Sequence, residues 1–221
     1  MNDQISAEQF QQSEGVDEWR VLGEGACTFF RTDSFAASAG LVQAISALDG
    51  VDAHPPDIDI RQDGVTVRLI TITDDYFGMS QRDVELARRI SAAARELGLA
   101  GDPSGVQTLL VIPGAPDPGE VMPFWRALLA YEPRDDSPEE DLVDPHYRGP
   151  AFWFERMKEP RQGGGAIHVA IWVPYDQAEA RVAAALAAGG HMVRDEYAPS
   201  WWTLADAAGN EADISTTLSR S

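Results

Sequence analysis

The chain offers few side chains suited to catalysis, and the most suggestive of them is His54. An imidazole titrates near neutral pH, so it can serve as a general acid or a general base. The sequence contains no glycine-rich phosphate loop, no nucleophile elbow and no CxxC pair, so we expect no nucleotide cofactor. His54 is therefore a candidate acid or base, and a loop histidine without a chemical role is the alternative interpretation.

A hairpin directly after His54 is the element that must position it. Apolar residues alternate over 58–60 and again over 65–69, which predicts two buried strands. Between them, Asp63-Gly64 is the dipeptide that most readily supplies two positive φ angles, and it predicts a tight turn. The second strand is expected to run on into Gly78-Met79-Ser80.

Two amphipathic helices are predicted to flank this hairpin. Ser34 and Ser80 are the expected N-caps, and Asp83 is an acid that can accept hydrogen bonds from first-turn amides. The apolar faces consist of Phe35, Leu41, Val42, Ile45 and Leu48 in the first helix, and of Leu86, Ala87, Ile90, Ala94 and Leu97 in the second. Helices packed on one side of an antiparallel sheet give an α+β fold.

The order of these motifs resembles the pterin-4a-carbinolamine dehydratases, also called 4a-hydroxytetrahydrobiopterin dehydratases. The matching features are a His-Pro loop, a strand, a D-G turn, a strand ending in Thr, and then G-M-S-Q-R-D-V-E-L-A-R-R-I, all within roughly the first hundred residues. The resemblance implies lyase activity on a small pterin, with His54 as the catalytic residue. It also implies that the pterin is bordered by Ala53, His54, Pro55, Ile70, Thr71, Ile72 and Thr73.

The chain departs from this family at two histidines. The family's loop reads H-H-P and its second strand ends T-H, whereas this chain has His54-Pro55-Pro56 and Thr71-Ile72. Proline and isoleucine cannot transfer protons, and one positioned acid or base typically contributes about 10²–10⁴-fold in rate. The departure therefore predicts that the fold is kept while dehydration is reduced to a remnant.

The second half of the chain repeats a strand–helix–strand pattern. Residues 99–106 have no periodicity, so we place the boundary there, between a domain of residues 1–100 and one of residues 106–221. The acidic stretch 134–149 is expected to be a loop with little to bury. Asp176 is the expected N-cap of a later helix, with Glu179 as its capping-box partner.

Two βαβββ units with this spacing resemble the glyoxalase and bleomycin-resistance group, the vicinal oxygen chelate superfamily. The resemblance rests on D-P-x(5)-F-W-R-x-L-L-x-Y (117–131), P-A-F-W-F-E (150–155), I-H-V-A-I-W-V (167–173) and D-A-A-G-N-E (206–211). It implies that a dehydratase-like layer is followed by an open barrel that often holds a divalent metal.

Matching positions place the implied metal ligands at Glu155, His168 and Glu211. The fourth ligand position falls on Leu109 or Leu110, neither of which can bind a metal. One imidazole and two carboxylates would suit Zn, Mn or Fe. The alternatives are a structural histidine and two solvated acids in a metal-free binding barrel.

Composition narrows the classes of partner. Seventeen basic and thirty-six acidic residues give a net charge of −19, which repels phosphate backbones and anionic membranes, so we expect neither nucleic acid nor membrane as a partner. The lone Cys27 permits no intramolecular disulfide, and the N-terminus has no cationic apolar leader, so we expect a cytoplasmic protein.

Five tryptophans in the second half could fill a core or line a pocket for a flat ligand, and adjacent Trp201 and Trp202 must point to opposite faces of a strand. Three hypotheses follow. They are dehydration of a pterin carbinolamine, metal-dependent lyase, isomerase or dioxygenase chemistry, and non-catalytic binding of a drug or metabolite. A homodimer is a further expectation from the first resemblance.

Overall fold

The structure is a computed structural model, and it describes residues 3–23, 25–157, 167–205 and 211–218. The side chains of Phe124, Ala127, Leu128, Ile167 and His168 are outside that description. The chain divides into two compact units. One contains Met1–Ile72 and Tyr76–Gln107, and the other contains Thr73–Asp75 and Thr108–Ser221. Each unit is described by itself.

The first unit is built on an antiparallel sheet with strand order β2-β3-β5-β4. These strands are β2 (Arg20–Leu22), β3 (Gly25–Arg31), β4 (Asp57–Arg61) and β5 (Gly64–Leu69). A smaller sheet has the order β1-β7-β6, with β1 (Gln4–Ile5), β6 (Thr71–Thr73) and β7 (Tyr76–Ser80). The two short 3-10 turns are η1 (Val51–Ala53) and η2 (Pro103–Gly105).

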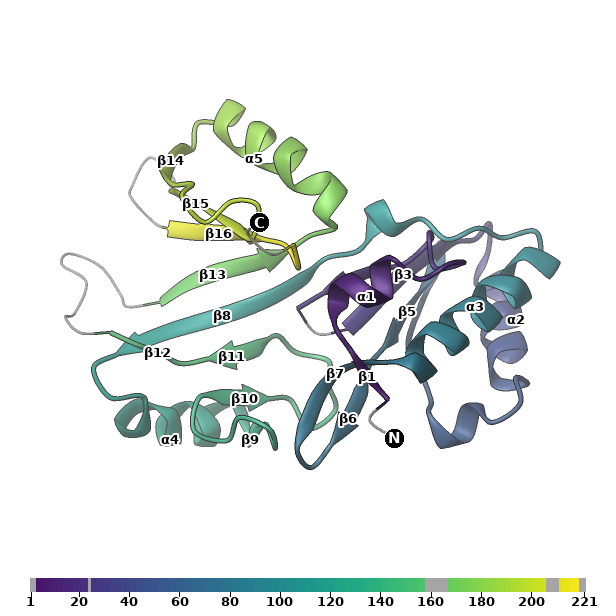
Figure 1. The fold of residues 1–221 in the computed structure, drawn as a ribbon, viewed down its shortest axis with the longest axis horizontal. Coiled ribbons are helices and arrows are strands. Elements are labelled where there is room, and N and C mark those ends of the chain that lie inside the picture. The colour runs from purple at the N-terminus through teal and green to yellow at the C-terminus, as the bar shows by residue number, and fades with distance from the viewer. Residues whose placement is uncertain (1–2, 24, 158–166, 206–210, 219–221) are drawn as a thin grey trace. The chain divides into compact units, whose positions relative to one another are not determined.

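The helices of this unit are α1 (Ala7–Gln11), α2 (Phe35–Ser46) and α3 (Gln81–Glu96), and α2 and α3 run side by side along the four-stranded sheet (Figure 1). Their apolar sides meet the sheet in one core that contains Trp19, Phe30, Leu41, Val67 and Ile90. The predicted α+β layer is therefore confirmed.

Helix ends follow the predicted signals. The Ser34 side chain accepts a hydrogen bond from the backbone N–H of Ala37, and Ser80 forms a capping box with Asp83. After α3, Gly98 takes a φ of +73°, a left-handed conformation that glycine adopts without strain. Two expected core residues lie at helix ends instead. Phe35, the first residue of α2, is 57% exposed, and Leu97, the C-cap of α3, is 50% exposed.

The turn between β4 and β5 differs from the prediction. Arg61 pairs with Gly64, so the two loop residues are Gln62 and Asp63, and neither has a positive φ. Gly64 is instead the first residue of β5, where a Cβ atom would overlap the ring of Phe29. Close packing, rather than a left-handed turn, therefore requires the glycine.

The continuation of the second strand also differs from the prediction. The chain leaves the main sheet after Leu69 and forms the separate hairpin of β6 and β7, with Asp74 and Asp75 between its strands. Strand β7 pairs with β1, through Ser80 opposite Gln4. Sequence periodicity could not reveal this hairpin because its strands are short and only partly buried.

The second unit contains one mixed sheet of nine described strands, with the order β14-β15-β16-β13-β8-β11-β10-β9 and with β12 also paired to β8 (Figure 1). The first βαβββ unit comprises β8 (Thr108–Ala115), α4 (Pro118–Leu129), β9 (Glu132–Pro133), β10 (Asp141–Val143), β11 (Ala151–Trp153) and β12 (Glu155–Arg156). The second comprises β13 (Ile167–Trp172), η3 (Tyr175–Gln177), α5 (Ala178–Ala187), β14 (His191–Arg194), β15 (Trp201–Ala205) and β16 (Glu211–Ser215).

Both helices of this unit cover the same face of the sheet. Helix α5 packs in a cluster with Ile171, Trp202, Leu204 and Ile214, and α4 packs in another with Val111, Phe152 and Phe154. Val111 pairs with Val169, two residues before Ile171, so these clusters lie on one side. We call the opposite side, which carries Trp201, Thr203, Asp213, Ser215 and Trp172, the helix-free face.

Two predictions for the second half were wrong. The acidic stretch 134–149 contains the buried strand β10, in which Leu142 is fully buried and Asp141 is 5% exposed. Asp176 lies in the 3-10 turn η3, and the N-cap of α5 is Gln177, which makes no side-chain capping bond. The motif at 206–211 lies outside the described residues except for Glu211.

Among the residues that the structure describes, no helix has the length and apolar character that crossing a bilayer requires.

Candidate functional site

His54 lies at the C-terminal end of the turn η1, directly before strand β4. Its backbone N–H donates to the carbonyl of Val51 at 3.1 Å. The turn and the strand together fix where the imidazole projects. The backbone of His54 is thus held by the turn, and its imidazole ring is held by a tertiary contact.

That tertiary contact is with Asp83, in the first turn of helix α3. The His54 Nε2 atom lies 2.7 Å from Oδ1 of Asp83. The His54 side chain is 19% exposed, whereas the Asp83 side chain is fully buried. A buried carboxylate beside a partly exposed imidazole is an arrangement suited to proton transfer at the ring.

The second carboxylate oxygen of Asp83 is held by three donors. Oδ2 accepts from the Ser80 backbone N–H at 2.7 Å, from Ser80 Oγ at 2.9 Å and from Thr71 Oγ1 at 2.8 Å. The positive end of the α3 dipole also favours a negative charge at this position. These donors fix the orientation of the Asp83 carboxylate toward the imidazole.

This geometry determines what His54 can do chemically. When Nε2–H donates to Asp83, the tautomer is fixed and the lone pair of Nδ1 is left as a base. After Nδ1 takes up a proton, the adjacent carboxylate stabilises the imidazolium. Within the described residues, Nδ1 has no hydrogen-bond partner, so His54 can exchange a proton there with a ligand or with water.

Tyr76, on strand β7, lies in the electrostatic field of the same carboxylate. Burial, and then the negative charge of Asp83, raise the pKa of the Tyr76 phenol above its ordinary value. The neutral phenol donates to the carbonyl of Met79 at 2.6 Å. Tyr76 therefore acts as a hydrogen-bond donor near the site and is a poor proton donor to a substrate.

The other residues expected to border a pterin are placed unevenly. Thr71 is joined to His54 through Asp83, and Ile70 is half-buried beside it in sequence. Ala53, Pro55, Ile72 and Thr73 are exposed. The structure thus brings together His54 and Thr71, while the replaced positions Pro55 and Ile72 offer apolar surface to solvent.

The expected metal ligands lie on three different strands of the second unit. Glu155 on β12 pairs with Gly114 of β8, and His168 on β13 pairs with Ile112 of the same strand. Glu211 is the first residue of β16, which runs parallel to β13. By strand alternation, Glu155 and Glu211 both belong to the helix-free face.

Glu211 already has a cationic neighbour. Its Oε2 atom lies 3.8 Å from a guanidinium nitrogen of Arg194. Among the described side chains, no three of His, Cys, Asp or Glu are close enough together to hold a metal ion. The side chain of His168, one of the three expected ligands, is outside the described residues.

Sequence reasoning missed two groups that the structure brings forward. The sequence identified Asp83 only as a helix-capping acid. The available signal was an acid three residues after the N-cap Ser80, in the same predicted domain as the His54 loop. The second group is Asp213, whose Oδ1 accepts from Thr203 Oγ1 at 2.7 Å on the helix-free face. No sequence signal distinguished Asp213 from an ordinary strand acid.

Two protein families match this chain, one in each half. The profile of the family described as Pterin 4 alpha carbinolamine dehydratase matches residues 3–93, and that of the Glyoxalase-like domain matches residues 109–215. The first unit is also similar to individual proteins named "Putative pterin-4-alpha-carbinolamine dehydratase". One from Nocardia farcinica is 34% identical over 80 residues, which are 36% of this chain and 82% of that protein.

A second such protein, from Acidobacterium capsulatum, is 31% identical over 74 residues, which are 34% of this chain and 78% of that protein. Both likenesses fall short of half of this chain and leave the second unit uncovered. Taken with the matching profile and the preserved His54 loop, the chain belongs to the pterin-4a-carbinolamine dehydratase family through residues 3–93, and a glyoxalase-like domain follows over residues 109–215.

Proposed function

We propose that the first domain binds a pterin 4a-carbinolamine and dehydrates it slowly, with His54 as its one acid–base group. The observation that supports this proposal is the 2.7 Å contact between His54 Nε2 and the buried Asp83. This contact orients the imidazole and leaves Nδ1 facing away from the carboxylate.

Dehydration of a 4a-carbinolamine breaks the C4a–O bond and removes the proton of the adjacent ring nitrogen. The products are water and a quinonoid dihydropterin. His54, protonated at Nδ1, would give its proton to the departing hydroxyl, and water would take the proton of the ring nitrogen. The reaction needs one group to protonate the hydroxyl and one to take the proton of the ring nitrogen, and this site supplies a single imidazole. Because one positioned acid or base typically contributes about 10²–10⁴-fold in rate, we expect a smaller acceleration than in a site that supplies both groups.

The pterin would lie against residues 53–55 and 70–73. Thr71 is the most constrained of these, because its hydroxyl is hydrogen-bonded to both Ser80 and Asp83. The apolar side chains of Pro55 and Ile72 would contact the flat ring without taking part in proton transfer. The family resemblance and the position of His54 support this placement.

The test is stopped-flow dehydration of a freshly generated 4a-carbinolamine, compared with the spontaneous rate in the same buffer. We expect the full chain to accelerate the reaction and His54→Ala to abolish the acceleration. His54→Gln, whose amide nitrogen can take the place of Nε2 and donate to Asp83 but cannot transfer a proton, separates chemistry from structure. Equal rates with and without the full chain would refute this function.

For the second domain we propose binding of a small molecule on the helix-free face. This proposal is supported by the exposed Trp201 and Trp153 on that face, each of which is 36% exposed. Large exposed rings beside polar groups are typical of ligand sites. If a ligand binds on this face and not at residues 53–55, only substitutions in the second domain should weaken its binding.

Metal-dependent lyase, isomerase or dioxygenase chemistry is the alternative for this domain, with Glu155, His168 and Glu211 as ligands of Zn, Mn or Fe. The contact between Glu211 and Arg194 favours the metal-free proposal, because the carboxylate already forms an ion pair with a guanidinium. Elemental analysis of protein purified without chelators decides between them. A stoichiometric ion that His168→Ala removes would favour the metal.

We also propose that the two domains span residues 1–100 and 106–221 and that the protein forms a homodimer. The lack of periodicity over residues 99–106 supports this boundary, and the family resemblance supports the dimer. Limited proteolysis with mass spectrometry would locate the boundary, and light scattering after size-exclusion chromatography would give the oligomeric state.

A further inference from the structure

The peptide group that joins Met79 to Ser80 has both of its polar atoms in short hydrogen bonds, and we call it the 79–80 peptide group. Its carbonyl oxygen, on Met79, accepts from the hydroxyl of Tyr76 at 2.6 Å. Its N–H, on Ser80, donates to Oδ2 of Asp83 at 2.7 Å. Because a peptide group is planar and stiff, the direction of its carbonyl also sets the direction of its N–H. The Tyr76 hydroxyl is therefore connected, through one peptide group, to the carboxylate that contacts His54.

Tyr76 reaches the Met79 carbonyl by lying back along its own strand. Tyr76 and Gly78 are two positions apart on β7, so they share a face of that strand. A Cβ atom at Gly78 would lie 2.7 Å from the Tyr76 hydroxyl oxygen, so the glycine leaves the space that the phenol occupies. Burial, and then the charge of Asp83, raise the pKa of the phenol, which keeps its proton available for the carbonyl at neutral pH.

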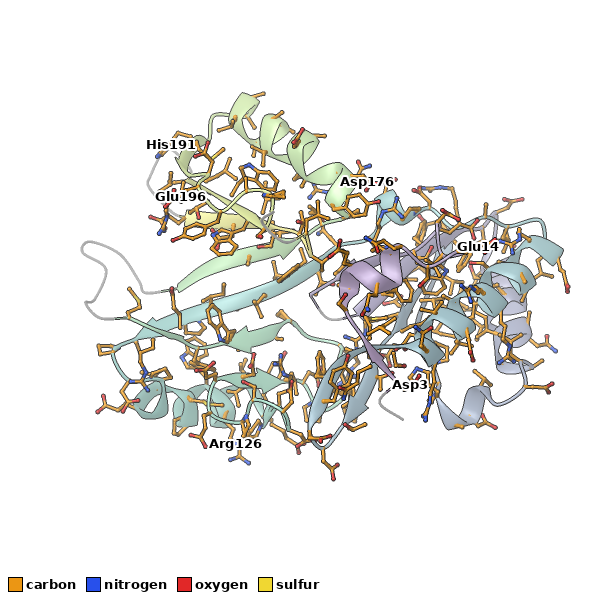
Figure 2. The ribbon with its side chains drawn as sticks, viewed as in Figure 1. Asp3, Glu14, Arg126, Asp176, His191 and Glu196 are labelled. Carbon is orange, nitrogen blue, oxygen red and sulfur yellow. The ribbon has the colours of Figure 1, made fainter. Side chains whose placement is uncertain are left out.

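The N-terminal strand β1 holds the same end of β7, but only over a short length. It has two residues, and Ile5 pairs with Met79. Asp3, labelled in Figure 2, lies directly before β1, and its carbonyl accepts the backbone N–H of Gln81 at 2.9 Å. A ladder this short restrains the backbone weakly, so the bond from Tyr76 adds a restraint directly before the start of α3.

On the basis of the dehydration proposed for the first domain, we propose that Tyr76 is a positioning residue of that site. Its hydroxyl orients the 79–80 peptide group, whose N–H orients Asp83, which in turn orients His54. A donor on the carbonyl also polarises the peptide group and strengthens its N–H as a donor. The Asp83 side chain is fully buried, so bulk water cannot replace a donor that turns away.

The first test is Tyr76→Phe in the full chain, followed by proton NMR spectroscopy of the imidazole. A ring N–H held by a carboxylate gives a signal far downfield and exchanges slowly with water, because the charge-assisted bond is short. The His54 signal is identified as the one that His54→Gln removes. We expect the wild-type chain to show this signal and Tyr76→Phe to move it upfield and broaden it. This readout needs no pterin, so it is independent of the proposed dehydration.

Stopped-flow dehydration gives the second readout. We expect Tyr76→Phe to lower kcat by about two- to tenfold, the equivalent of one ordinary hydrogen bond, and to leave KM unchanged. Gly78→Ala keeps the hydroxyl but places a Cβ atom where it would displace that hydroxyl. It should therefore change the imidazole signal and kcat in the same direction as Tyr76→Phe.

Ser91→Ala is the matched control. It removes a buried hydrogen bond of the same helix, from Trp19 Nε1 to Ser91 Oγ at 3.0 Å. It should lower the free energy of unfolding but leave the imidazole signal and kcat unchanged. Circular dichroism and thermal unfolding confirm that each variant is folded, and Gly78→Ala takes the place of Tyr76→Phe should that variant unfold.

The outcomes separate this proposal from the proposed function. A wild-type imidazole signal in both Tyr76→Phe and Gly78→Ala overturns the positioning role, as does a change that Ser91→Ala reproduces. A wild-type chain without the downfield signal also overturns it, because the bond to Asp83 is then not held in solution. If the signal responds to Tyr76→Phe while the wild-type chain does not accelerate dehydration, the proposed function fails and the positioning of His54 stands.

Discussion

The carboxylate of Asp83 joins His54 to the start of helix α3. Its Oδ1 atom lies 2.7 Å from the imidazole Nε2, and its Oδ2 atom accepts the backbone N–H of Ser80 at 2.7 Å in the capping box. One buried side chain therefore both starts a helix and orients the candidate acid–base group. We therefore expect the stability of the first domain and its proposed chemistry to depend on this one residue.

Asp83→Asn should impair both roles. An amide can still accept from Ser80, but it must direct N–H groups at some of its present donors, so one or more buried bonds are lost. We expect a loss of about 1–3 kcal/mol in the free energy of unfolding. Dehydration should fall to the level of His54→Ala. Urea unfolding and stopped-flow kinetics measure the two effects.

Glu85→Gln, which removes an exposed carboxylate two residues further along the same helix, is the control for net charge and helix content. It should leave both measurements unchanged. An Asp83→Asn protein with wild-type dehydration would show that the carboxylate serves the helix alone.

Restoring the replaced imidazoles should raise activity. Pro55→His and Ile72→His put back the family's histidines at exposed positions, where new side chains need no room in the core. Each restored acid or base could add about 10²–10⁴-fold to the dehydration rate. The double variant is measured by stopped flow beside the same variant carrying His54→Ala.

An increase that disappears with His54→Ala would show that the three imidazoles act together in one site. Asp52→His, a nearby exposed position that the family does not use, controls for the gain of an imidazole as such. No gain from the double variant would mean that the pterin does not bind at this loop.

Asp141 should make the stability of the second domain depend on pH. Burial raises the pKa of its carboxyl above the ordinary value, and this effect is partly offset by the Ser137 hydrogen bond and by Arg134. The folded state therefore holds the proton to a higher pH than the unfolded state. Stability from this group is full below the ordinary carboxyl pKa and falls as pH rises through the raised value.

Asp141→Asn removes this titration, so its stability relative to wild type should increase as pH rises from about 4 to 7. Urea unfolding at several pH values measures the difference. Glu139→Gln, an exposed carboxylate of the same segment, should give a flat difference. A flat difference for Asp141→Asn as well would show that the Arg134 ion pair, at 3.3 Å, fully compensates the burial.

Gly64 and Gly40 should respond in opposite directions to alanine. A Cβ atom at Gly64 would overlap the Phe29 ring and the backbone of Phe30, so Gly64→Ala should cost about 1–3 kcal/mol of unfolding free energy. At Gly40, inside α2, a Cβ atom would meet nothing within 4 Å, so Gly40→Ala should stabilise by about 0.5–1 kcal/mol. Thermal and urea unfolding of the two variants test this contrast, and a destabilising Gly40→Ala would reveal a neighbour on that helix face.

The sequence by itself determined the elements whose signals are local. The caps at Ser34 and Ser80, the stop at Gly98, the alternation of β5 and the opposite faces of Trp201 and Trp202 all depend on residues within a few positions of each other. The family motifs then indicated which protein family each half of the chain resembles. Hydrogen-bonding reach and side-chain periodicity are short-range properties, so they can be read from neighbouring residues.

Only the tertiary structure decided which distant residues meet. His54 and Asp83 are 29 positions apart, and their contact depends on how the turn η1 packs against α3. The pairing of Thr203 with Asp213 likewise required the register of β15 on β16, and the burial of β10 required its neighbours in the sheet. These relationships depend on the close packing of segments that are far apart in the chain. Leaving a buried polar group unpaired costs free energy, so the arrangement in which such groups pair is selected.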